Sequence, residues 1–253
     1  NVFTPMGEAA DMVAKKYSIT REECDKFALW SHQKATRALR DKDWYSKRIA
    51  PVKVPTPDGT TRTVDTDETV RFQSLDEPET AYSKLASLEP RFTSDGVHTA
   101  GNSSQIVDGA AAAMLMSEEK ANQLGLKPMA TIKSMAVAGD EPHIMLLGPI
   151  PAMRKALKRA GDLTMDDMNI IEPNEAFASP PLAFAKEFGY SFDDPRVNPT
   201  GGAIALGHPI GATGVIYFTE MIHEMQRKGL RYGLQTICGG GGVGIATIVE
   251  KEK

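Results

Sequence analysis

Two glycine-rich stretches near the C-terminal end most strongly constrain how this chain can fold. One spans residues 201–214 and reads Gly-Gly-Ala-Ile-Ala-Leu-Gly-His-Pro-Ile-Gly-Ala-Thr-Gly, and the other is Cys-Gly-Gly-Gly-Gly at 238–242. Consecutive glycines weaken a purely structural strand, but they allow positive φ and let a backbone approach a ligand closely. We therefore expect turns that present His208 and Cys238 to a bound molecule.

Three polar residues in this region have both a structural and a catalytic interpretation. A free cysteine is most often a small buried apolar residue, and a lone histidine most often a satisfied core residue. Asn174, in Pro-Asn-Glu-Ala-Phe-Ala at 173–178, could simply cap the end of an element. The glycines around His208 and Cys238 favour catalysis, because a histidine and a cysteine on such turns can move protons beside backbone N–H groups aimed at an oxyanion.

Composition excludes several classes of protein. The chain has 253 residues, 41% of them hydrophobic, and a net charge of −4, so it carries no electrostatic footprint for nucleic acid. It contains no apolar run of about 18 residues, and we expect no membrane span. Two cysteines form no disulfide framework and fit a reducing compartment, the cytoplasm or an organelle matrix. The five histidines show no metal-ligand spacing, so we expect no metal site.

The pattern of residues divides the chain at about residue 107. Residues 8–41 are predicted to be helical, with Thr20 and Glu23 as a capping box, and the Pro- and Gly-punctuated stretch 42–106 is predicted to be largely irregular. Strands and helices then alternate, which predicts an α/β sheet covered by helices. The expected strands are 110–116, 130–137, 169–172, 233–238 and 243–250. The expected helices are 118–124, 152–160, 182–188 and 211–227. The last has apolar residues on more than one face, which predicts that it is covered on several sides.

The three segments around Asn174, His208 and Cys238, in this order, resemble the active-site motifs of the thiolase family, which cleaves or forms 3-ketoacyl-CoA. The resemblance implies an αβαβα-layered fold, of which this chain supplies the C-terminal half, with a mixed five-stranded sheet, at 107–253. Residues 1–106 would be a portion of the loop domain that covers the CoA site. Family members are about half as long again, and the resemblance implies that the N-terminal domain with the acylated cysteine is lacking.

The resemblance also implies roles for individual residues in a reaction on coenzyme A thioesters that needs no cofactor. His208 would activate the nucleophilic cysteine and donate to the enolate oxygen together with a water held by Asn174. Cys238 would protonate or deprotonate the α-carbon, and the backbone N–H of Gly240 would serve the second oxyanion hole. The residues expected to line the acyl and pantetheine channel are Met6, Ser104, Met145 and Phe177.

The missing nucleophile leads to expectations about partners. Cys24 lies in a charged helical run whose acidic neighbours raise a thiol pKa, so it is rejected as the nucleophile. An acetyl-CoA C-acyltransferase of this kind would need the N-terminal thiolase half as a separate chain or fragment, and the complete unit would form a dimer or tetramer. The alternatives are a non-catalytic acyl-CoA-binding scaffold, which has no need of all three polar residues, and a decarboxylating ketoacyl synthase, which uses a second histidine where Cys238 stands.

Overall fold

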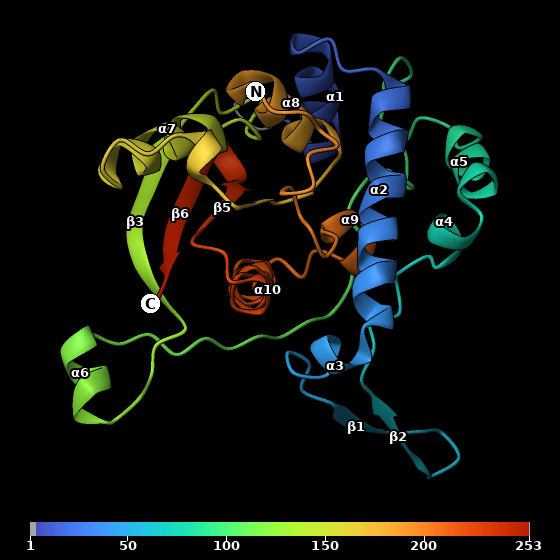
Figure 1. Cartoon of the computed structure of the whole chain (residues 1–253). Coiled ribbons are helices and arrows are strands. Elements are labelled where there is room, and N and C mark those ends of the chain that lie inside the picture. Colours follow the sequence, from blue (N-terminus) through green and yellow to red (C-terminus); the bar gives the residue numbers. More distant parts are fainter. Residues whose placement is uncertain (1–3, 253) are drawn as a thin grey trace.

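The computed structural model describes residues 4–252, and Figure 1 shows a sheet flanked by helices beside a long upright helix. The helices are α1 (Met6–Lys16), α2 (Arg21–Arg40), α3 (Lys42–Tyr45), α4 (Gln73–Asp76), α5 (Pro78–Ala86), α6 (Glu118–Gln123), α7 (Pro149–Arg159), α8 (Ser179–Phe188), α9 (Ala203–Leu206) and α10 (Thr213–Lys228), with two 3-10 turns, η1 (Met165–Asp167) and η2 (Gly240–Gly242). The strands are β1 (Val52–Pro55), β2 (Thr61–Val64), β3 (Ala130–Gly139), β4 (Ile170–Pro173), β5 (Tyr232–Gly239) and β6 (Val243–Lys251).

The main sheet is mixed and has the strand order β3-β6-β5-β4. The pairs β3–β6 and β5–β6 are antiparallel, while β4 runs parallel to β5 with Pro173 opposite Thr236. Because β4 and β5 are parallel, their C-terminal ends lie side by side at the same edge. Asn174, which follows β4, and Cys238, the second-last residue of β5, therefore lie at the same edge of the sheet.

The two faces of this sheet are covered by different helices. On one face α7 and α8 pack in the main hydrophobic cluster with Ile171, Leu234 and Ile248. On the other, Met221 and Met225 of α10 pack against Ile170 and Val249. The buried residues of α10 follow one stripe, and the rest of the helix is partly exposed, so this chain covers one side of it and cover on several sides stays a prediction.

The predicted N-terminal helix is two helices. Helix α1 ends because Ser18 adopts a left-handed conformation (φ 52°), and the N–H of Ile19 bonds back to the carbonyl of Ala14 at 2.8 Å. The chain re-enters a helix at the predicted capping box. The Thr20 hydroxyl accepts from the N–H of Glu23 at 3.1 Å, and the Glu23 carboxylate accepts from the N–H of Thr20 at 2.7 Å.

The stretch 42–106, expected to be largely irregular, contains three short helices and the β1–β2 hairpin, which projects away from the body of the molecule (Figure 1). The division of the chain at residue 107 stays a prediction. No helix within residues 4–252 combines the length and the apolar character that a membrane span requires.

Four of the five expected strands of the main sheet form within about two residues of their predicted bounds, but the fifth is wrong. Residues 110–116 are exposed and belong to no strand, and Met114 is 80% exposed. The sheet therefore has four strands instead of five. An apolar run becomes a strand only where an edge is available to accept its backbone hydrogen bonds, and periodicity alone does not show this.

Candidate active site

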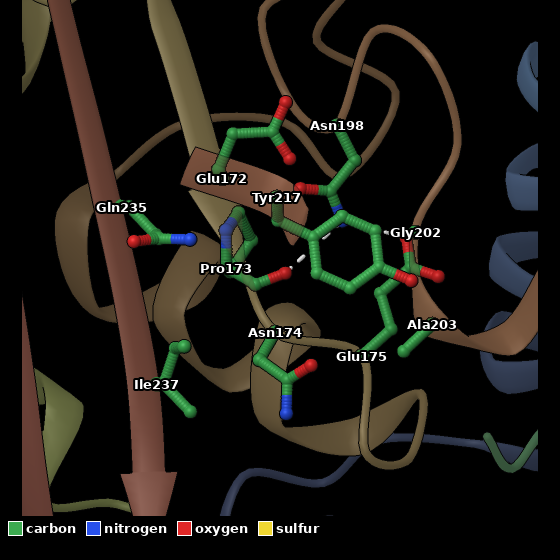
Figure 2. A pocket seen from close by; sticks show the side chains of 10 residues that line it. All are labelled: Glu172, Pro173, Asn174, Glu175, Asn198, Gly202, Ala203, Tyr217, Gln235 and Ile237. Atoms are coloured by element: carbon green, nitrogen blue, oxygen red, sulfur yellow. Dashed lines mark hydrogen bonds between the residues drawn. The ribbon is translucent and has the colours of Figure 1, made fainter. Parts of the chain in front are cut away.

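The end of β4 places Asn174 beside β5. The Asn174 backbone N–H donates to the carbonyl of Thr236 at 2.9 Å, which continues the parallel ladder one residue beyond the strand. The Asn174 side chain is 6% exposed, and its Oδ1 has no partner among the described residues. In Figure 2 its amide lies below Pro173 and points away from the ring of Tyr217.

Glu175, the next residue, ties this turn to the first glycine-rich stretch. Its carboxylate accepts hydrogen bonds from the Ser31 hydroxyl (2.6 Å), from the Asn198 amide (2.6 Å) and from the backbone N–H of Ile204 (3.1 Å). A Cβ on Gly202 would lie 2.2 Å from the carboxylate carbon of Glu175, so glycine is required at this close approach. Helix α2, the β4 turn and the segment leading to His208 are thus held as one unit.

His208 is held on both ring nitrogens. Its Nδ1 lies 2.6 Å from the hydroxyl of Thr213, and its Nε2 lies 3.3 Å from the amide nitrogen of Asn174. Its backbone N–H donates to the carbonyl of Gln105 at 3.0 Å. Burial lowers the pKa of the His208 imidazole, which keeps the ring neutral and able to accept a proton at neutral pH.

Cys238 stands at the end of β5, opposite Gly244 of β6, and leads into the glycine turn. Gly241 and Gly242 in this turn have positive φ, which confirms the expectation of a glycine-dependent backbone. Cys238 is half-buried and packs against the main hydrophobic cluster. Burial raises the pKa of its thiol to about 11, so the resting group is the neutral thiol, which is an acid toward a carbanion.

The remaining predicted residues fall into two groups. Phe177 and Met145 are buried members of the same hydrophobic cluster against which Cys238 packs. By contrast, Met6 is 52% exposed at the start of α1, and Gly240 is exposed in the turn after β5. Ser104 is partly buried, and its backbone N–H donates to the carbonyl of Ala176 at 3.0 Å, beside Phe177. The structure thus brings Phe177, Met145 and Cys238 into one cluster and Asn174 and His208 into contact.

Behind Asn174 lies a small internal pocket with an acidic wall (Figure 2). Burial raises the pKa values of both Glu172 and Glu175. The charge of Glu175 raises the pKa of Glu172 further, whereas the hydrogen bonds that Glu175 accepts partly offset its own rise. Lys34, whose Nζ donates to the carbonyl of Val197 at 2.5 Å, has its pKa lowered to about 8 by burial. This region is therefore low in dielectric, and it favours neutral forms.

An open groove of about 470 Å³ passes the residue that follows His208. It is lined on one side by residues 107–111 and on the other by residues 209–212. A Cβ on Gly109 would lie 2.7 Å from the side chain of Pro209, so the two walls touch at this point.

Cys24 is fully buried in α2, and burial together with Asp25 and Glu23 raises the pKa of its thiol. Its rejection as a nucleophile therefore agrees with its surroundings. Within residues 4–252, no group of three or more His, Cys, Asp or Glu side chains could hold a metal ion.

Sequence reasoning missed two residues that organise this site, Thr213 and Glu175. Both lie inside the motifs quoted above. Thr213 stands five residues after His208, and at this spacing its side chain can contact the His208 ring only if the intervening turn is tight. Away from this site, His98 is fully buried, and its Nδ1 lies 2.7 Å from the carboxylate of Asp11.

Two family models match the chain. Residues 126–251 match the C-terminal domain of thiolases, and residues 2–119 match the N-terminal domain. The expectation that the chain lacks the N-terminal domain is therefore wrong, and the separate N-terminal partner inferred from it has no support. The prediction rested on the greater length of family members and on the absence of a nucleophilic cysteine, and neither shows that the surrounding domain is missing.

Named relatives and solved structures agree with this assignment. The chain is 49% identical over 246 residues to an acetyl-CoA acetyltransferase of Chromobacterium violaceum, covering 97% of this chain and 60% of the relative. It is 47% identical to a 3-ketoacyl-CoA thiolase of Vibrio vulnificus, with 97% and 62% covered. The crystal structure of the Bacillus anthracis acetyl-CoA acetyltransferase superposes with a TM-score of 0.90 at 41% identity, over 98% of this chain and 60% of that one. The chain thus spans about 60% of the length of these relatives.

Proposed function

The chain belongs to the thiolase family, and from this premise we propose that it acts on 3-ketoacyl-CoA and acetyl-CoA as an acyltransferase. Asn174, His208 and Cys238 would form the centre that makes and quenches the enolate of acetyl-CoA. The names of the relatives, acetyl-CoA acetyltransferase and 3-ketoacyl-CoA thiolase, support this substrate class. Coenzyme A thioesters are the substrates, and the chemistry needs no redox group or metal. Assembly as a dimer or tetramer is part of the proposal.

In the cleavage direction, the keto carbon forms a bond to the attacking thiolate, which in the overall reaction is that of coenzyme A. The carbon–carbon bond then breaks and leaves its electron pair on the α-carbon of acetyl-CoA. The Cys238 thiol gives its proton to that carbon and becomes a thiolate, which is later reprotonated from solvent. In the synthetic direction the same sulfur removes the proton. A thiol whose pKa is raised to about 11 suits the first task at rest, because it is fully protonated at neutral pH.

The enolate oxygen requires hydrogen-bond donors as its charge grows. His208 Nε2, once it has taken a proton, and a water held by Asn174, whose amide nitrogen lies 3.3 Å from Nε2, would serve this task. Gly240, exposed in the turn after Cys238, would supply a backbone N–H for the thioester oxygen. Phe177 and Met145 would enclose the acyl group, while Met6 and Ser104 would contact the pantetheine arm.

The observation that carries the proposal is the contact between Asn174 and His208 at the edge where β5 delivers Cys238. Acyl transfer also needs a nucleophile, and the two cysteines of this chain do not provide one, because Cys238 handles the proton and Cys24 is buried. A test should therefore follow proton transfer at the α-carbon, which needs no acylated residue.

The experiment is deuterium exchange into the methyl group of acetyl-CoA in D₂O, followed by mass spectrometry. We expect catalysed exchange, and we expect Cys238→Ala to slow it by a factor of about 10²–10⁴, the usual contribution of a positioned acid or base. Cys24→Ala is the matched control, since it removes the other thiol, which is fully buried in α2. Absence of exchange with the unmodified protein, or wild-type exchange in Cys238→Ala, would overturn the proposal.

A further inference from the structure

The hydroxyl of Thr213 has two neighbours that together determine where its proton lies. It is 2.8 Å from the carbonyl oxygen of Pro209, which can only accept a hydrogen bond, and 2.6 Å from His208 Nδ1. A threonine hydroxyl has one proton. When that proton goes to Pro209, the oxygen can serve His208 only as an acceptor, so Nδ1 must carry the proton of the neutral ring.

A second contact, on the opposite side of the ring, leads to the same assignment. Asn174 presents its amide nitrogen to Nε2 at 3.3 Å, and an amide N–H requires a lone pair there. The hydrogen bonds then run in one direction, from the Asn174 amide to Nε2, from Nδ1–H to Thr213, and from Thr213 to Pro209. The reverse ring tautomer would face Thr213 with a lone pair and the Asn174 amide with an N–H.

We infer that Thr213 is a positioning residue that holds His208 in the Nδ1–H tautomer, with Nε2 free to act as the base. The tautomer assignment itself does not depend on the proposed function. Only its catalytic consequence does, namely that Nε2 receives the proton that it later offers to the enolate oxygen. Which ring nitrogen of a histidine reacts is set by the bond that the other one makes.

The position of Thr213 is itself rigid. It is the first residue of α10 and is 1% exposed, and its backbone N–H also donates to Pro209, at 2.9 Å. A purely structural role at the start of the helix is the competing explanation. It predicts that loss of the hydroxyl affects stability and leaves the tautomer unchanged.

The test reads the tautomer directly by ¹H–¹⁵N NMR of the protein labelled with [¹⁵N]histidine, with His208 assigned by loss of its signals in His208→Gln. In the unmodified protein we expect a pyrrole-like Nδ1 and a pyridine-like Nε2. Thr213→Val should yield a mixture with protonated Nε2, and Thr213→Ser should restore the original pattern. Thr219→Val is the control, because its hydroxyl likewise bonds a carbonyl four residues back, at 2.7 Å, but lies away from His208.

Activity provides a second readout. We expect Thr213→Val to slow acetyl-CoA exchange about ten-fold, the effect of one lost hydrogen bond of ordinary strength, and to move its acidic pH limb downward, because the acceptor that favoured the imidazolium is gone. A pyrrole-like Nε2 in the unmodified protein, or an unchanged tautomer in Thr213→Val, would overturn the inference. NMR needs no substrate, so the tautomer can be measured even if the proposed function is wrong. If the valine variant misfolds, the unmodified protein still tests whether His208 carries its proton on Nδ1.

Discussion

Replacing Gly244 by alanine tests whether the cysteine turn depends on a close approach of two backbones. Gly244 pairs with Cys238 across β5 and β6, and a Cβ added to it would lie 2.0 Å from the carbonyl carbon of Gly148 and 2.1 Å from the nitrogen of Pro149. Both atoms belong to main chain at the start of α7, so no side chain can rotate away. One element must move.

The size of the effect follows from these distances. Ordinary carbon contacts lie at about 3.5 Å, so α7 and β6 must separate by roughly 1.5 Å. Overpacking of cores typically costs about 1–3 kcal/mol, and a clash with main chain belongs at the upper end. For a chain of this size, about 3 kcal/mol lowers the melting temperature by roughly 6–12 °C. The shift also displaces Cys238, so acetyl-CoA exchange should fall as well.

The assay is thermal unfolding followed by circular dichroism, and Gly139→Ala is the matched control. Gly139 lies in β3 opposite Val243, one register position from Gly244, and a Cβ there would meet nothing within 4 Å. We expect the control to melt within a few degrees of the unmodified protein. If Gly244→Ala melts at the same temperature as Gly139→Ala, the close approach of α7 to β6 does not exist and the reasoning fails.

Two further predictions concern buried carboxyl groups. Asp11 accepts hydrogen bonds from Thr93 (2.8 Å) and His98 (2.7 Å), and these bonds outweigh burial and lower its pKa from the ordinary 3.8. Its contribution to stability is therefore present above pH 3.8 and lost as pH falls through the lowered value. In urea unfolding, the free energy of unfolding of Asp11→Asn should therefore fall less steeply at acid pH than that of the unmodified protein. An equally steep fall in both proteins would contradict this. For Glu172, burial raises the pKa well above 4.5, so the folded protein loses stability as pH rises above 4.5. Glu172→Gln should therefore be the more stable protein at pH 8 and match the unmodified protein near pH 4, and greater stability of the unmodified protein at pH 8 would refute the assignment.

The sequence by itself determined the features that depend on neighbouring residues along the chain. The capping box of Thr20 and Glu23 formed as predicted, because both bonds lie within one turn. Strands β3 to β6 followed from apolar runs bounded by glycine and polar residues, and the motifs around Asn174, His208 and Cys238 indicated the family before any geometry was known.

Tertiary structure alone decided the features that need a partner distant in sequence. Residues 110–116 have the composition of a strand but pair with none of the strands in residues 4–252, and they stay exposed. The protonation pattern of His208 depends on a turn that returns Thr213 to Nδ1 and on a parallel strand pair that carries Asn174 to Nε2. Local propensity acts over a few residues, whereas a buried hydrogen bond joins whichever groups the packed backbone brings together. For that reason the motifs could be identified in the sequence, but the ring nitrogen of His208 that carries the proton could not.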